Sequence, residues 1–143
     1  RIQGFLDTIA SNANYQVINR ADCDGQIEIA MPTMKQMLKE TPAVDVVMAL
    51  NDRSALGALA AIESMEIDNV LVYGVDGSPD VKELINTGLI QATAAQSPVK
   101  MGQLAYQKAK ALLENKKIEK KIEVPVELIS RDNISNFELT GWQ

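Results

Sequence analysis

The sequence contains no histidine and a single cysteine, Cys23. Without histidine the chain lacks the side chain that most often serves as a general base or a zinc ligand. Cys23 can form no disulfide within the chain, and it has neither the base nor the cation that would activate a thiolate nucleophile. No glycine-rich phosphate loop and no metal-ligand spacing occurs either. We therefore expect a protein that is not an enzyme and holds no cofactor or metal.

Long apolar runs are also missing. None approaches the ~18 residues that a membrane span requires, and no basic start with an apolar middle marks a signal peptide. The chain opens at Arg1 rather than at a methionine, which favours a piece of a longer protein. The hydrophobic fraction of 46% in 143 residues is sufficient for one domain with its own core.

Positive charge is in the minority, with a net charge of -5. A protein that binds a phosphate backbone would present a basic face, so we expect no nucleic-acid partner. The basic cluster is interleaved with acids, which is typical of a solvated turn: Lys116, Lys117, Lys120 and Lys121 stand among Glu114, Glu119 and Glu123.

Apolar runs and helical stripes alternate along the chain. The expected strands are Tyr15–Ile18, Val44–Leu50, Asn69–Val75, Ile90–Ala95 and, interrupted by Pro125, Ile122–Ile129. The expected helices are Ile2–Ile9, Gln26–Glu40 with a kink or a later start at Pro32, Ala55–Met65, Ser78–Gly88 and Ser97–Leu113, the last with an apolar face turned to the core. This alternation predicts an α/β fold with a mostly parallel sheet flanked by helices on both faces. The tail from residue 130 is expected to be irregular and to dock through Phe137, Leu139 and Trp142.

Polar side chains follow three of the expected parallel strands. Asn51 follows the strand that ends at Leu50, Asp76 follows Val75, and Gln96 follows Ala95. Ligands of open parallel sheets bind outside the carboxyl ends of the strands, so these side chains should share one rim. Carboxylate and amide groups in that number suit a ligand with several hydroxyls better than a phosphate. Singly, each has a structural alternative as part of a helix cap, a turn or a solvated surface.

Five segments carry a resemblance: Arg1–Phe5, Asn51–Ala58, Tyr73–Pro79, Gln96–Pro98 with Met101-Gly102, and Val124–Ile129. In this order they resemble the type I periplasmic binding proteins, and they look closest to the ribose-binding branch. Together they extend over nearly the whole chain. LacI-type transcription regulators share the same core.

The resemblance implies a ligand site made of Arg1, Asn51, Asp76 and Gln96. In this family an arginine, an asparagine, an aspartate and a hinge glutamine at the matching positions bind the sugar. The family also places an aromatic residue in the loop where this chain has Cys23, so the resemblance makes Cys23 a fifth candidate ligand-binding residue, with a small buried hydrophobe as the alternative. A thiol cannot stack on a sugar ring, so the resemblance names a sugar or sugar-like polyol without identifying it.

The resemblance also implies that this chain is the C-terminal half of a two-lobed protein. Residues 1–96 would form the C-terminal lobe core without its first strand. Residues 97–121 would cross and pack with the missing N-terminal lobe, and residues 122–143 would return and form the tail. The parent protein would be an extracytoplasmic receptor, periplasmic or lipid-anchored, that delivers its sugar to a membrane ABC permease. The alternative is the effector-binding domain of a LacI-type sugar-responsive regulator; the ending Leu128–Asn133 and Trp142 favours transport.

Overall fold

The computed structural model describes residues 1–142, which build a four-stranded sheet. Its strands are β1 (Val46–Met48), β2 (Leu71–Asp76), β3 (Ala92–Ala95) and β4 (Glu127–Ser130), in the order β1-β2-β3-β4. The first three are parallel, and β4 pairs antiparallel with β3. The predicted α/β class with a mostly parallel sheet is confirmed. The predicted strand Ile122–Ile129 is shorter in the structure: β4 begins after Pro125 and lies at an edge of the sheet.

Five α-helices and one 3-10 helix accompany this sheet within the described residues. They are α1 (Ile2–Ala10), α2 (Ile27–Glu40), α3 (Asp52–Ser64), α4 (Pro79–Thr87), α5 (Pro98–Leu113) and η1 (Ile134–Asn136). Helix α2 continues through Pro32 instead of starting after it. None of these helices combines the length and apolar character needed to cross a membrane.

The start and end of α4 follow the predicted local signals. Ser78 Oγ accepts a hydrogen bond from the backbone N–H of Val81, and Pro79 occupies the first helical position. Gly88 ends the helix with φ of 87°, a left-handed conformation that costs glycine little. These contacts involve neighbours in sequence, so the chain specifies this helix locally.

The core lies between α2, α3, α4 and the sheet. Its most completely buried apolar side chains are those of Leu38, Ala55, Ala61, Val72, Val81, Ile85, Ile90, Ala95 and Ile129. Helix α3 approaches α2 closely at Gly57, where an added Cβ would stand 2.6 Å from the Cβ of Ala30. Helix α3 also packs on β1 and β2, so its first turn lies beside the carboxyl ends of these two strands.

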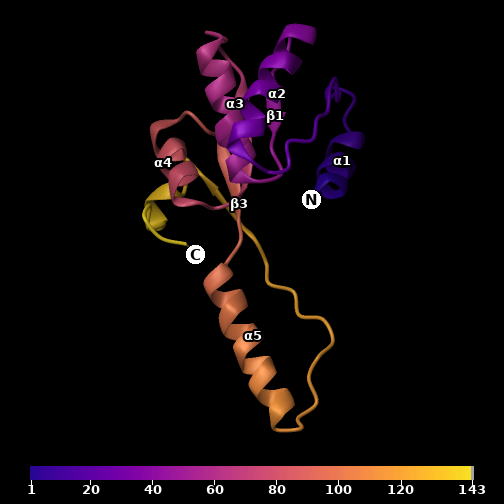
Figure 1. Ribbon diagram of the computed structural model, residues 1–143, viewed down its shortest axis with the longest axis vertical. Helices are drawn as coiled ribbons and strands as arrows, with labels where there is room; N and C mark the ends of the chain where they lie inside the picture. The colour runs from indigo at the N-terminus through magenta and orange to yellow at the C-terminus, as the bar shows by residue number, and fades with distance from the viewer. Residues whose placement is uncertain (143) are drawn as a thin grey trace.

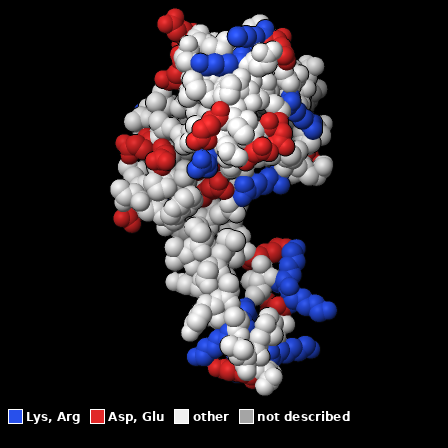
Figure 2. Space-filling model, viewed as in Figure 1, with Lys and Arg blue, Asp and Glu red and all other residues white. Residues whose placement is uncertain are grey.

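Helix α5 and the return segment 114–126 project from the rest of the molecule as an arm (Figure 1). Residues 1–96 and 127–142 form what we call the body. The prediction that α5 turns an apolar face to the core is wrong, because none of its residues is buried. Val99, Met101, Tyr106, Leu112 and Leu113 are all exposed on it. Lysines and acids stand along one side of the arm and at its far end, and the other side next to the body shows no charge in this view (Figure 2).

The predicted strand Tyr15–Ile18 does not form. Residues 15–20 are neither helix nor strand, and Tyr15, Val17 and Ile18 are exposed. A β-branched run forms a strand only where a neighbouring strand accepts its hydrogen bonds and covers its side chains. Within residues 1–142, β1 pairs only with β2, and residues 15–18 supply no partner to its other side.

The C-terminal tail packs against α4, as predicted for two of its three docking residues. Phe137 and Leu139 pack on the core, whereas Trp142 is about half exposed next to Pro98 and Val99. The completely buried Lys82 donates hydrogen bonds through Nζ to the backbone carbonyls of Glu138 and Gly141. Burial lowers the pKa of Lys82, and the Glu138 carboxylate acts in the opposite direction. A buried amino group thus ties the tail to α4.

Candidate functional site

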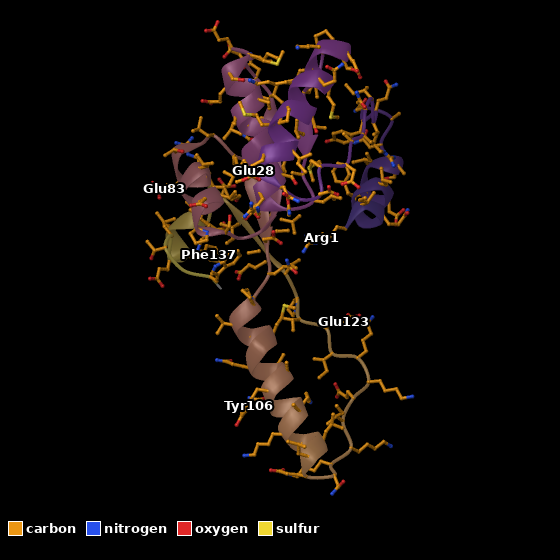
Figure 3. The ribbon with its side chains drawn as sticks, in the orientation of Figure 1. Arg1, Glu28, Glu83, Tyr106, Glu123 and Phe137 are labelled. Atoms are coloured by element: carbon orange, nitrogen blue, oxygen red, sulfur yellow. The ribbon has the colours of Figure 1, made fainter. Side chains whose placement is uncertain are left out.

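Three of the five sequence-predicted site residues meet at the junction of body and arm. Arg1 lies at the edge of the body that faces the arm (Figure 3). Its Nη2 donates to Asp76 Oδ1 over 3.3 Å, and its Nη1 donates to the carbonyl of Leu50 over 2.6 Å. Gln96 Nε2 donates to the same Asp76 Oδ1 over 2.6 Å. The structure therefore brings Arg1, Asp76 and Gln96 together around one carboxylate oxygen.

The sheet determines where these side chains stand. Asp76 is the last residue of β2 and is paired with Ala95, the last residue of β3. The backbone N–H of Gln96 donates to the carbonyl of Asp76 over 3.1 Å, which fixes the two residues side by side. Within residues 1–142, Asp76 Oδ2 accepts no hydrogen bond from the protein. The trio thus offers a carboxylate acceptor, an amide and a guanidinium at one point.

The backbone of Asp76 is unusual. Its φ is 136°, a region that residues with a Cβ rarely adopt, and the following Gly77 has φ of 78°. Conformations of this kind cost of order 1–3 kcal/mol and persist only where surrounding contacts impose them. A strained turn at Asp76 and Gly77 therefore presents the carboxylate.

Asn51 and Cys23 form a second group beside the first. Asn51 is the N-cap of α3: its Oδ1 accepts from the Ser54 N–H over 2.8 Å, and its Nδ2 donates to the Gly25 carbonyl over 3.1 Å. Cys23 is half-buried, with Sγ 3.2 Å from Ser54 Oγ. Asn51 therefore caps α3, the role that the sequence had suggested for Asp52 or Ser54, and one amide hydrogen and one lone pair of Asn51 remain for a ligand.

A cavity of about 740 Å³ connects the two groups. Arg1, Cys23, Asn51 and Gln96 line it, whereas Asp76 is not among its lining residues. Away from these polar residues it continues beside the open edge of β1 between apolar side chains, including Phe5, Val17, Met34 and Val47. Only its polar end therefore suits a small hydrophilic ligand.

Sequence reasoning missed several polar groups at this end. Ser54 links Asn51 and Cys23, and Arg20 also lines the cavity. Ser54 stands three residues after the cap, a spacing that could have signalled the contact. No cluster of three or more potential metal ligands occurs in residues 1–142.

The sequence of the chain matches a known protein family. The model of the periplasmic binding protein domain matches residues 1–117. The ribose import binding protein of Escherichia coli K12 is 32% identical over 129 residues, which are 90% of this chain and 43% of that protein. The ribose import binding protein of Bacillus subtilis is 37% identical over 113 residues, which are 79% of this chain and 37% of that protein.

Solved structures with a similar fold include solute-binding proteins of ABC transporters. An ABC transporter periplasmic solute binding protein from Actinobacillus succinogenes with bound D-allose has a TM-score of 0.90 at 25% identity, covering 94% of this chain and 48% of that one. The binding protein of an arabinose ABC transporter from Shewanella has a TM-score of 0.88 at 25% identity and covers 94% and 46%. The chain spans less than half the length of these relatives. It belongs to the periplasmic binding protein domain family.

Proposed function

We propose that this chain is the C-terminal half of a two-lobed solute-binding protein that holds a small sugar or sugar-like polyol and catalyses no reaction. The observation that carries the proposal is the meeting of Arg1, Asp76 and Gln96 at the carboxyl ends of β2 and β3. A carboxylate accepts hydrogen bonds from hydroxyls, a guanidinium donates to their oxygens, and an amide does both. Asn51 and Cys23, at the polar end of the same cavity, complete this half of the site.

The proposed parent protein acts outside the cytoplasm and presents its bound sugar to a membrane ABC permease. The relatives named above are import binding proteins or components of ABC transporters, which supports this reading over a sugar-responsive regulator. The first residues of the parent gene distinguish the two: a signal or lipid-attachment sequence supports transport, and a helix-turn-helix domain supports regulation.

The division of the chain into lobes is part of the proposal. We assign residues 1–96 to the C-terminal lobe core, 97–121 to a crossing and a helix on the other lobe, and 122–143 to the return and tail. The exposed apolar side chains of α5 support the second assignment, because they require a cover. The single pairing of β1 and the apolar cavity at its open edge support a core that lacks one strand.

A thermal-shift screen of the two-lobed protein against pentoses, hexoses, polyols and nucleosides tests the proposal. A ligand that binds only the folded state at a hundredfold excess over Kd stabilises it by about 2.7 kcal/mol. We expect at least one sugar or polyol to raise Tm and the same compound to raise the Tm of an Asp76→Ala variant much less. No shift with any sugar or polyol would contradict the proposal.

A further inference from the structure

Two completely buried polar side chains lie beneath the site. Asp52 is 1% exposed and Thr93 is 0% exposed. Asp52 is the first residue of α3, and Thr93 lies in the middle of β3. Both side chains are shut off from the surface, so neither is placed to touch a ligand. Buried polar groups are costly unless they are satisfied, so their partners show what they do.

Their partners belong to the turn that follows Asp76. Thr93 Oγ1 donates to Asp52 Oδ1 over 2.7 Å, and the same Oγ1 accepts from the backbone N–H of Gly77 over 3.2 Å. Asp52 Oδ2 accepts from the backbone N–H of Ser78 over 2.6 Å. The carboxylate and the hydroxyl therefore hold two successive backbone N–H groups immediately after the strained residue.

The approach of Asp52 to the sheet depends on Gly74 of β2. A Cβ on Gly74 would stand 2.3 Å from Asp52 Oδ1. The absence of that atom lets a side chain from α3 reach over β2 to β3. The buried Asp52 carboxylate thus joins α3, the strands β2 and β3, and the turn after Asp76.

We propose that Asp52 and Thr93 are positioning residues that set ligand affinity by holding Asp76 in its strained backbone conformation. The inference rests on the proposed function, because it takes Asp76 as a ligand-binding residue. Pinning Gly77 and Ser78 orients the peptide that follows Asp76, so the carboxylate is already directed toward Arg1 and Gln96 before the sugar arrives. Such preorganisation raises affinity by removing the ordering cost from the binding step.

The test compares Thr93→Val with Thr93→Ser in the two-lobed protein. Valine keeps the shape but removes the hydroxyl that serves Gly77 and Asp52, whereas serine keeps it. Titration calorimetry should show that Thr93→Val weakens sugar binding about tenfold or more, as expected for loss of a hydrogen bond to a charged group. Thr93→Ser should recover most of that affinity. Asp52→Asn, which removes the charge, provides a second variant if Thr93→Val does not fold.

Two controls separate positioning from stability. Ile85→Val, in the core of α4, should lower Tm and leave the Kd unchanged. Amide hydrogen exchange without ligand should be faster at Gly77 and Gln96 in folded Thr93→Val than in Ile85→Val. Wild-type affinity and wild-type exchange in folded Thr93→Val would overturn the inference. If the wild-type protein binds no sugar, the proposed function fails, and exchange at Gly77 still decides whether the buried pair holds the turn.

Discussion

Replacement of Gly74 by alanine should destabilise the protein through a side chain on another element. Gly74 lies in β2 with a φ that any residue adopts, so the backbone itself admits alanine. The new Cβ would stand 2.3 Å from Asp52 Oδ1, a separation that real structures do not tolerate, so the carboxylate must move. It then loses or weakens its hydrogen bonds to Ser78 and Thr93, of 2.6 and 2.7 Å.

The magnitude follows from these two contacts. A hydrogen bond to a charged group contributes about 1.5–3 kcal/mol. Alanine restores roughly 0.5–1 kcal/mol, because it has less conformational freedom than glycine in the unfolded chain. The net loss in the free energy of unfolding is therefore about 2–5 kcal/mol. Urea unfolding followed by circular dichroism measures it as a lower midpoint with an unchanged slope.

Gly4→Ala is the matched control. Gly4 lies in α1, and a Cβ added there would meet no atom within 4 Å. This variant should leave the midpoint unchanged or raise stability by up to about 1 kcal/mol, because alanine favours helix. A Gly74→Ala protein that unfolds at the wild-type urea concentration would refute the assigned packing of Asp52 on β2.

Two further predictions concern the carboxylate of the site and the buried lysine of the tail. Asp76→Ala should weaken sugar binding by more than about 2 kcal/mol, roughly 30-fold, because ligand donors lose their acceptor; calorimetric titration measures this, and unchanged affinity would remove Asp76 from the site. Burial lowers the pKa of Lys82 below its ordinary value of 10.5, so between the two values the unfolded chain binds more protons and stability rises with pH. In Lys82→Met, the free energy of unfolding measured with urea should no longer increase with pH in this range. If it increases as in wild type, another group causes the increase.

Elements stabilised by neighbours in sequence were predictable, and those that depend on distant partners were not. Helix α4 begins at Ser78-Pro79 and ends at Gly88 because its capping contacts span only a few residues. The run Tyr15–Ile18 has strand composition, but no strand lies beside it, so it remains irregular. Helix α5 has the apolar stripe of a core helix. The stripe alone does not indicate whether the body covers it, and in the structure no residue of α5 is buried.

The same distinction applies to the site. The rule that ligands bind at the carboxyl ends of parallel strands placed Asn51, Asp76 and Gln96 on one rim, and the family resemblance added Arg1. The structure joins Arg1, Asp76 and Gln96 directly, whereas Asn51 also caps α3. The buried support from Asp52 and Thr93 was not predictable, because it links residues 41 positions apart through the packing of α3 on the sheet.

A crystal structure of the two-lobed protein with a sugar or polyol identified by the thermal-shift screen tests the central claim most directly. We expect ligand hydroxyl oxygens within hydrogen-bonding distance of the Asp76 carboxylate and the Arg1 guanidinium. The ligand should lie at the polar end of the cavity, which Asn51 and Gln96 line. A ligand bound elsewhere, or one that contacts neither Asp76 nor Arg1, would contradict it.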